Sequence, residues 1–231
     1  MSRVAVTGGC GSLGRYVVEE LARHHDVTVI DRVPPTAARM HPGCRYQTAD
    51  VLDCERLTEL LKAHDETIHL AGIDIAIQAP DSNYFETNVM GTWNTLHAAE
   101  RAGQHKVVVC SSVSAFGFSD RAPIVAPHKL PTDDGQAPRP AHAYAISKQA
   151  MEVVSRGFAE RGSLEVTVLR PSFVIYPEIL RDVHEHVRVV DIEGDADATI
   201  GEVSSGSLSP IRSYVRPDDA ARAFRLALEL D

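Results

Sequence analysis

The chain of 231 residues is 44% hydrophobic and 24% charged, and its formal net charge is −9 at pH 7. This length and composition predict one globular domain, residues 1–231, that buries a core of its own. The negative charge argues against nucleic acid or an anionic membrane as the main partner.

The sequence contains no segment that predicts targeting or membrane insertion. No apolar run reaches the length of a membrane span, and the predicted first strand begins so close to Met1 that we expect no signal peptide. The four cysteines lack the paired spacing of a metal site. We therefore expect reduced thiols and a cytoplasmic location.

The chain begins with a predicted strand that runs into a glycine-rich turn. The short apolar run Val4–Val6 precedes the glycines, and apolar residues then recur at helical spacing. In this arrangement glycines allow a tight turn, the approach of a pyrophosphate and close packing of helix on strand. The N–H groups at the start of the helix favour phosphate charge. We therefore predict a phosphate site formed by Gly8, Gly11, Ser12, Leu13 and Gly14.

The second predicted strand, Val27–Ile30, ends at Asp31. At this position a carboxylate accepts hydrogen bonds from an adenosine ribose. The glycine turn and Asp31 together predict a dinucleotide-binding β-α-β unit. The neighbouring Arg32 leaves room for a 2′-phosphate, but Asp31 repels one, so NAD is favoured over NADP as the cofactor.

A third short strand, Arg45–Thr48, is followed by Asp50 and then by a helix through Leu57. Two interpretations of Asp50 stay open. Its carboxylate can accept a hydrogen bond from an adenine amino group, or it belongs to the cap of the helix, where Asp53 also lies.

The fourth predicted strand, Thr67–Gly72, ends in small residues against which a cofactor can lie. It contains His69, which we interpret as a buried core histidine and not as a catalyst. A long helix is predicted over 81–102. It includes Asn88 and ends at Gly103.

The fifth strand, Lys106–Cys110, ends at Ser112, and a proline-rich connection to Pro140 follows. The length of this connection suggests a functional loop that covers the site. A helix then begins at Ala143, and a sixth strand is predicted over 164–169.

The last part of the chain changes character. Residues 191–210 are acidic and rich in glycine and serine, so we expect them to be mobile. His184 and His186 make a poor metal site by themselves, and we predict no bound metal. A final helix begins at Pro217.

The alternation of strands and helices predicts an α/β fold, a doubly wound parallel sheet of the Rossmann type. Ligands of such sheets bind beyond the carboxyl ends of the strands. This is where Gly8, Asp31, Gly72 and Ser112 fall.

Tyr144 and Lys148 are four residues apart on a predicted helix, so their side chains share one face. A tyrosine with its ordinary pKa of about 10 is a poor base, and a nearby ammonium favours the phenolate. Ser112 can hydrogen-bond a substrate hydroxyl or carbonyl while Tyr144 moves a proton and hydride passes to or from the cofactor. This combination predicts an oxidoreductase.

Over nearly its whole length the sequence resembles the extended short-chain dehydrogenase/reductase family, the NAD-dependent epimerase/dehydratase group. The matching motifs are Thr7–Gly14, Asp31, Asp50–Val51, His69–Gly72, Asn88, Ser111–Ser112, Tyr144–Lys148, Leu169–Pro171 and Tyr214–Ala221.

The resemblance implies roles for particular residues. It makes Ser112, Tyr144 and Lys148 the catalytic triad, with Lys148 also holding the nicotinamide ribose. It places the pyrophosphate on the glycine turn, the adenosine ribose on Asp31 and the adenine on Asp50 and Val51. The cofactor contacts further include Leu70, Ala71, Gly72 and Asn88. Family members often dimerise through the helices that begin here near Asp81 and Ala143.

Typical members are longer and carry a smaller C-terminal domain that selects a nucleotide-sugar. We therefore expect an abbreviated substrate part, to which residues 172–216 contribute, or a truncated chain. Without a large lid, a small sugar or carbonyl compound is favoured as the substrate over a whole nucleotide-sugar. A dehydrogenase is thus the main hypothesis. A sugar epimerase or dehydratase that retains NAD and a non-catalytic dinucleotide sensor remain alternatives.

Overall fold

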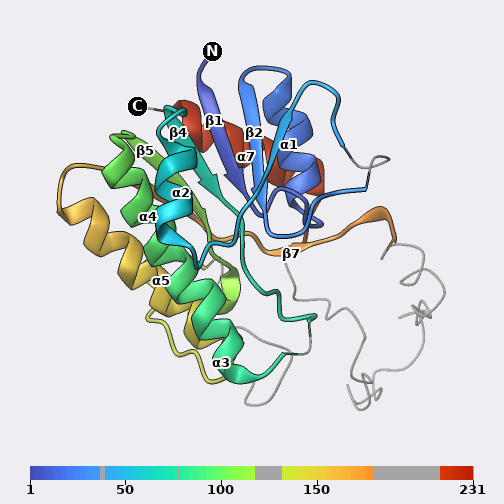
Figure 1. Cartoon of the computed structure of the whole chain (residues 1–231). Helices are drawn as coiled ribbons and strands as arrows, with labels where there is room; N and C mark the ends of the chain where they lie inside the picture. Colours follow the sequence, from blue (N-terminus) through green and yellow to red (C-terminus); the bar gives the residue numbers. More distant parts are fainter. Residues whose placement is uncertain (37–39, 78, 118–131, 179–213, 231) are drawn as a thin grey trace, which may run out of the picture.

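A computed structural model describes residues 1–36, 40–77, 79–117, 132–178 and 214–230 (Figure 1). A parallel sheet of six strands forms its centre, in the order β3-β2-β1-β4-β5-β6. The strands are β1 (Arg3–Thr7), β2 (Asp26–Asp31), β3 (Arg45–Thr48), β4 (Glu66–His69), β5 (Lys106–Cys110) and β6 (Glu165–Leu169). This order reverses direction between β1 and β4, and the crevice at such a point is where doubly wound sheets bind their ligands.

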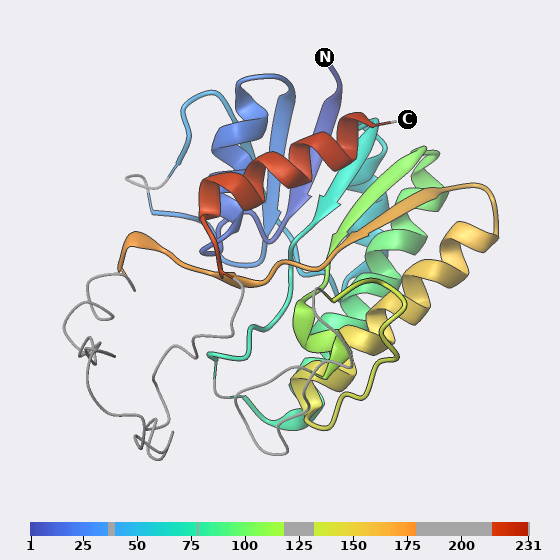
Figure 2. The same ribbon diagram turned by 180° about the vertical axis from the view of Figure 1, so that it is seen from behind.

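Helices cover both faces of the sheet, as the alternating pattern predicts. One face is covered by α1 (Gly14–Ala22) and α7 (Pro217–Glu229), which pack against each other and stand in front of the strands in Figure 2. The other face is covered by α2 (Cys54–Leu61), α4 (Gly91–Ala102) and α5 (Ala143–Glu160), seen at the front of Figure 1.

The strands divide their side chains between two cores because successive residues point to opposite faces. Val4 and Val6 lie in the core under α1 and α7, whereas Ala5 between them lies in the core under α2, α4 and α5. Val107 and Val109 share the core of Ala5, and their neighbour Val108 lies on the other side. Apolar burial on both faces holds the carboxyl ends of the strands in fixed register.

Two features differ from the prediction. The helix expected over 81–102 consists of α3 (Asp81–Tyr84), a π-helical segment (Phe85–Met90) and α4. A second, two-stranded parallel sheet pairs β7 (Phe173–Val174) with β8 (Tyr214–Val215), and the sequence analysis did not predict it. Strands of two residues are too short for a period-2 pattern, so only the tertiary structure reveals them.

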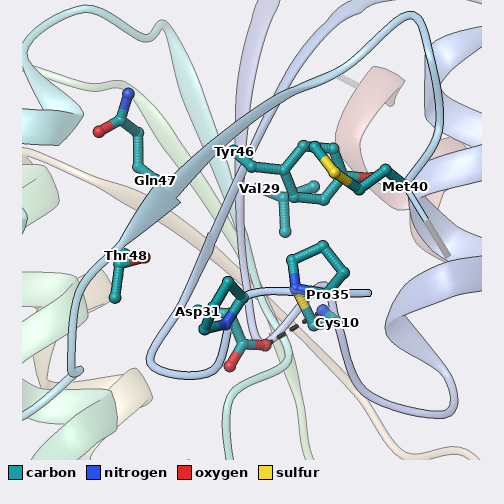
Figure 3. A pocket seen from close by; sticks show the side chains of 9 residues that line it. Cys10, Val29, Asp31, Pro35, Met40, Tyr46, Gln47 and Thr48 are labelled. Carbon is teal, nitrogen blue, oxygen red and sulfur yellow. Dashed lines mark hydrogen bonds between the residues drawn. The ribbon is translucent and has the colours of Figure 1, made fainter. Parts of the chain in front are cut away.

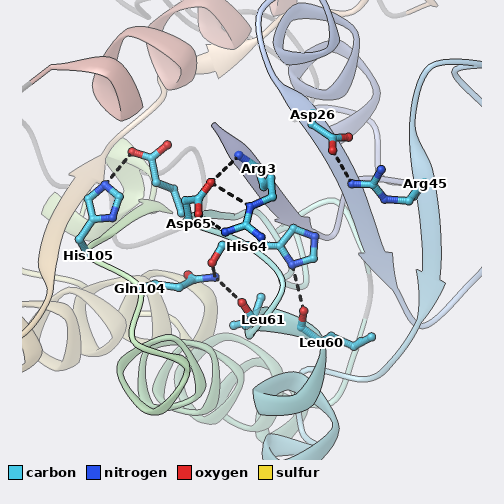
Figure 4. A network of polar contacts seen from close by, with 10 residues as sticks. Arg3, Asp26, Arg45, Leu60, Leu61, His64, Asp65, Gln104 and His105 are labelled. Carbon is cyan, nitrogen blue, oxygen red and sulfur yellow. Dashed lines mark hydrogen bonds and ion pairs between the residues drawn. The ribbon is translucent and has the colours of Figure 1, made fainter. Parts of the chain in front are cut away.

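The amino ends of the strands carry a polar network that closes this edge of the sheet (Figure 4). Asp65 accepts from the backbone and the guanidinium of Arg3, and these hydrogen bonds lower the pKa of Asp65 to about 2. Arg45 pairs with Asp26 at 2.8 Å. These ion pairs lie at the edge opposite the expected ligand site, so they are structural.

Several predicted features lie outside the described residues: most of the covering loop, the histidines at 184 and 186, and the segment 191–210. The extent of a single domain and of its substrate-side region therefore stays a prediction. Within the described part of the chain, no helix is long and apolar enough to cross a membrane.

Candidate active site

The glycine turn after β1 brings two strand ends into close contact. Gly8 has a φ of +73°, and a Cβ at this position would lie 2.5 Å from the backbone nitrogen of Ala71. A Cβ on Gly14 would lie 2.7 Å from the Cα of Gly9. Only glycine fits at either position. Gly11 and Ser12 are exposed at the start of α1, where N–H groups can reach a phosphate.

Asp31 lies at the carboxyl end of β2, beside this turn (Figure 3). Its Oδ2 accepts from the backbone N–H of Cys10 at 3.1 Å, and its Oδ1 accepts from that of Val33 at 3.1 Å. Burial and the charge of Asp31 raise the pKa of the Cys10 thiol to about 11, so the thiol stays protonated. This agrees with Cys10 being a small tolerated residue and not a reactive one.

A pocket of about 140 Å³ opens beside Asp31, and the sequence analysis did not predict it. It lies between the ends of β2 and β3 and the segment that connects them (Figure 3). Its lining is Cys10, Val29, Asp31, Pro34, Pro35, Met40, Tyr46, Gln47 and Thr48. Arg32, the residue considered for a 2′-phosphate, is exposed and is not part of this lining.

The structure separates the two interpretations of Asp50. The side chain that caps α2 is that of Asp53, which accepts from the backbone N–H of Arg56 at 3.0 Å. Asp50 accepts from the backbone N–H of Leu52 at 3.0 Å through one oxygen. The cap interpretation therefore belongs to Asp53, and the adenine contact of Asp50 stays a prediction.

The predicted cofactor segment after β4 is held by Asn88. Asn88 accepts from the N–H of Ile73 at 2.7 Å and donates to the carbonyl of Ile73 at 3.2 Å. Asn88 also donates to the hydroxyl of Ser147 at 2.9 Å. Ser147 lies on α5, between Tyr144 and Lys148. Asn88 is fully buried, and its amide ties the backbone of Ile73 to α5. Its contact with a cofactor stays a prediction. Leu70 and Ala71 lie directly before this segment, against Thr7 and Gly8.

His69 is buried and has partners on both ring nitrogens, as expected of a core histidine. The Thr92 hydroxyl donates to the carbonyl of Asn88 at 2.6 Å, so it accepts from Nε2 of His69 at 3.1 Å. The Thr7 hydroxyl then donates to Nδ1 at 2.7 Å. Burial, followed by the charge of Lys148, lowers the pKa of His69 to about 3. The ring is therefore neutral and links β1, β4 and α4.

Ser112 and Tyr144 meet at the carboxyl end of β5. Ser112 caps a short 3₁₀-helix (Val113–Phe116) by accepting from the backbone N–H of Ser114 at 3.1 Å. Its hydroxyl also lies near the phenol of Tyr144 and acts to lower the pKa of that phenol. Residues that lie 32 positions apart in the chain are thereby joined in one site, as the resemblance implies.

Tyr144 is a neutral phenol in this structure. Its side chain is buried, and burial is the largest influence that raises the pKa of its phenol well above the usual value. The charge of Asp74 adds to this effect, and Ser112 opposes it. The expectation from sequence was a phenolate favoured by Lys148. It did not include desolvation, because a single sequence does not show how deeply this face of the helix is buried.

Lys148 lies one helical turn after Tyr144 on α5, as predicted. Its Nζ donates to the carbonyl of Cys110 at 2.9 Å and lies 5.8 Å from the centroid of the Tyr144 ring. A Cβ on Gly72 would be 3.7 Å from this Nζ. Burial lowers the pKa of Lys148. The ends of β4 and β5 and the face of α5 that carries Lys148 therefore lie next to one another.

A buried ion pair on the same face of α5 was missed in the sequence analysis. Glu152, one turn after Lys148 on α5, binds Arg170 through both carboxylate oxygens at 2.8 and 2.7 Å and accepts from the Ser111 hydroxyl at 2.5 Å. Arg170 also binds Asp134 at 2.7 Å. Arg170 and Ser111 lie 18 and 41 residues from Glu152 in the chain, so no local sequence pattern indicates these contacts. The four-residue spacing of Tyr144, Lys148 and Glu152 does place the carboxylate on the same helix face and could have suggested that it points inward.

The residues at this edge fit a dinucleotide. The cradle between Gly8 and Ala71 admits no Cβ, the start of α1 is exposed, and the Asp31 carboxylate lies at the end of the next strand. These are the parts that bind pyrophosphate and ribose in such folds. Ser112, Tyr144 and Lys148 lie at the carboxyl end of β5, where the reactive end of a dinucleotide would be held.

Comparison with known proteins agrees with this geometry. Residues 4–231 match the model of the NAD dependent epimerase/dehydratase family. The chain belongs to this family. The prediction of an NAD-dependent oxidoreductase with a Rossmann-type sheet is thereby confirmed at the level of the family.

The names of the proteins to which this chain is similar include enzymes of sugars and of nucleotide-sugars. The chain is 34% identical to an L-arabinose 1-dehydrogenase (NAD(P)(+)) from Haloferax volcanii, over 79% of this chain and 71% of the relative. It is 31% identical to a UDP-glucose 4-epimerase from Mycolicibacterium smegmatis, over 96% and 72%. Its fold is similar to that of MoeE5 in complex with UDP-glucuronic acid and NAD, with a TM-score of 0.75, 27% identity and coverage of 99% and 73%.

Proposed function

We propose that this protein is an NAD-dependent dehydrogenase that transfers hydride between the nicotinamide and a hydroxyl or carbonyl of a small sugar. The observation that carries the proposal is the position of Tyr144 and Lys148 beside the carboxyl end of β5, where Nζ of Lys148 donates to the carbonyl of Cys110 and lies 5.8 Å from the centroid of the Tyr144 ring. The L-arabinose 1-dehydrogenase among its relatives supports a free sugar as the substrate. NAD supplies the hydride acceptor when it is bound.

Each predicted catalytic residue has a role that follows from its surroundings. The Ser112 hydroxyl binds the reacting oxygen of the sugar and orients it toward Tyr144. Tyr144 moves the proton: its phenol, kept neutral by burial, donates to a carbonyl, and its phenolate accepts from a hydroxyl. Lys148, fixed by the carbonyl of Cys110, holds the nicotinamide ribose and favours the phenolate when Tyr144 loses its proton.

The test is a screen of the purified protein with NAD against neutral aldoses, uronic acids and simple alcohols, with NADH absorbance as the readout. Tyr144→Phe is expected to lower turnover by about 100-fold or more, because a positioned acid–base group contributes that much. It is expected to keep its affinity for NAD. Tyr46→Phe is the matched control, since among the described residues the phenol oxygen of Tyr46 has one hydrogen-bond partner, the backbone N–H of His41. Turnover that is unchanged in Tyr144→Phe would contradict the proposal.

A sugar epimerase is the second candidate, and the identity with a UDP-glucose 4-epimerase favours it. In an epimerase the cofactor is reduced and reoxidised within one turnover. Formation of a sugar isomer without net NADH would therefore decide for the epimerase, and net NADH decides for the dehydrogenase. A non-catalytic sensor would show neither product, and its binding of NAD would be the same in Tyr144→Phe.

We also propose a homodimer that forms through the α3–α4 and α5 side of the molecule. Large apolar side chains are exposed on these neighbouring helices: Phe85, Met90, Trp93, Ile146 and Val153. Exposed apolar patches of this kind mark interaction surfaces. All four cysteines are free thiols, which fits the reducing cytoplasm where we propose that the protein acts.

A further inference from the structure

Asp74 is a carboxylate near the predicted catalytic residues, and the mechanism above does not use it. It lies two residues after Gly72, on the segment that leaves the carboxyl end of β4 and leads to α3 (teal in Figure 1). This segment starts beside the catalytic lysine, because a Cβ on Gly72 would be only 3.7 Å from Nζ of Lys148.

The segment is fixed at both ends against the helices of the site. At its beginning, Asn88 holds the N–H and the carbonyl of Ile73. At its end, the hydroxyl of Tyr84 donates to the carbonyl of Ile77 at 2.7 Å. The Tyr84 ring in turn packs edge-on against Tyr144, with 5.9 Å between the ring centroids. The backbone that carries Asp74 is thus held by α3 and the π-helical segment, which in turn contact α5.

The charge of Asp74 influences groups on other parts of the chain, among them α5 and the segment after β7. Burial, and then Asp74, raises the pKa of Tyr144 on α5 and of Tyr176 after β7. Burial lowers the pKa of Lys148, and Cys110 on β5 and Asp74 partly offset this. The carboxylate of Asp74 is therefore near Tyr144 and Lys148, in agreement with the 3.7 Å between a Cβ on Gly72 and Nζ of Lys148.

Asp74 also keeps hydrogen-bonding capacity for a ligand. Its Oδ1 accepts from the backbone N–H of Ala76 at 2.8 Å. Among the described residues, no ion pair involves its side chain, which is exposed. An ionised carboxylate has about four lone-pair sites, so most of its accepting capacity is open to solvent or to a ligand.

We propose that Asp74 accepts hydrogen bonds from hydroxyl groups of the substrate and selects an uncharged sugar over an anionic one. A carboxylate can accept from two neighbouring hydroxyls through charge-assisted hydrogen bonds. The same charge repels the carboxylate of a uronic acid or the phosphate of a sugar phosphate, and specificity of this kind is a difference between attraction and repulsion. The inference rests on the proposed sugar dehydrogenase and names the class of its substrate.

The test compares D-galactose with D-galacturonate, which differ only in the group at carbon 6. Wild type, Asp74→Asn and the control Asp26→Asn each receive both sugars. Asp26 pairs with Arg45 at the opposite edge of the sheet, so its variant loses the same charge away from the site. Two quantities are measured: kcat/KM with NAD, and the affinity of the NADH complex for each sugar by calorimetry.

Asp74→Asn is expected to lower kcat/KM and affinity for D-galactose by about tenfold or more, the value of a hydrogen bond to a charged group. The preference of Asp74→Asn for galacturonate over galactose is expected to rise by at least the same factor. Asp26→Asn is expected to change this preference by less than about twofold, because salt screens distant charges. A preference that is the same in both variants, or no binding of either sugar to wild type, would overturn the proposal. Sugar binding with this preference but without NADH formation would overturn the dehydrogenase function alone.

Discussion

At the scale of single residues, Asp31 uses both carboxylate oxygens in backbone hydrogen bonds, to the N–H groups of Cys10 and Val33. These bonds fix the orientation of the carboxylate and leave lone pairs that can accept from ribose hydroxyls. A 2′-phosphate at the same position would be repelled by the charge of this carboxylate. The geometry therefore supports a preference for NAD.

We predict that Asp31→Ala weakens NAD binding by about tenfold, the loss of one charge-assisted hydrogen bond, and weakens NADP binding less. The dissociation constants of both cofactors with wild type and variant, from fluorescence titration, check this. Asp50→Ala is a useful comparison, because that residue is predicted to contact adenine and does not distinguish the two cofactors. An unchanged ratio of NAD to NADP affinity in Asp31→Ala would refute the role of Asp31.

Gly8 offers a test that separates backbone strain from close approach. Gly8 and Gly162 have nearly the same φ, +73° and +77°, but a Cβ on Gly162 would meet nothing within 4 Å. Gly162→Ala should lower the free energy of unfolding by about 1 kcal/mol, the cost of the left-handed conformation. Gly8→Ala should cost clearly more and abolish NAD binding, because the new methyl group displaces Ala71. If urea unfolding showed the same loss of unfolding free energy for Gly8→Ala and Gly162→Ala, the space between Gly8 and Ala71 would have room for a methyl group.

The residues of the glycine turn and Asp31 could be predicted because they lie in one short β-α-β unit with a recognisable local pattern. Asp74 and Glu152 could not. Their significance comes from partners brought together by the fold, such as Ser111, 41 residues from Glu152. The neutral state of Tyr144 was likewise hidden, since spacing along a helix indicates a shared face but not its burial.

At the scale of elements, the π-helical segment Phe85–Met90 positions Asn88. Its wider turn departs from the 3.6-residue period that predicts a helix over 81–102, and a single π turn leaves no clear mark on that period. The result is an inward amide that holds Ile73 and Ser147 together. The sequence analysis placed Asn88 among the cofactor contacts, and the structure gives its side chain a supporting position between β4 and α5.

The His69 network joins the same elements and makes folding stability depend on pH. His69 is neutral in the folded chain, with a pKa lowered to about 3, whereas the ordinary histidine pKa of 6.5 applies after unfolding. Below pH 6.5 the unfolded state takes up a proton that the folded state does not. The stabilisation is therefore complete above about pH 6.5 and is lost as the pH falls toward 3.

For this single group the loss between pH 7.5 and pH 5.5 is about 1.4 kcal/mol. We predict that His69→Gln, which cannot be protonated, is less stable than wild type at pH 7.5 but loses less stability on going to pH 5.5. Urea unfolding at the two pH values measures both quantities. His64, whose pKa burial also lowers, contributes equally to both proteins and cancels. The same loss in variant and wild type would exclude His69 as its source.

At the scale of the whole molecule, the two faces of the sheet differ in what their outer helices leave exposed. On one side, α3, the π-helical segment, α4 and α5 lie next to one another and expose five large apolar side chains. On the other side, the large apolar side chain exposed within α7 is Leu226. A protein that associates through apolar contacts would use the first side.

We predict that the protein sediments as a dimer of about twice its mass of 25.2 kDa. A charge placed at the centre of a buried symmetric interface stays unpaired, so Val153→Glu should shift the protein to the monomer. Val153 is 60% exposed on α5, and the change should leave the fold and NAD binding of the monomer intact. Leu226→Glu, at a position 40% exposed on the opposite face, is the matched control and should remain dimeric. Sedimentation velocity distinguishes these outcomes. A monomeric wild type, or dissociation caused equally by both substitutions, would exclude the α4–α5 side as the interface.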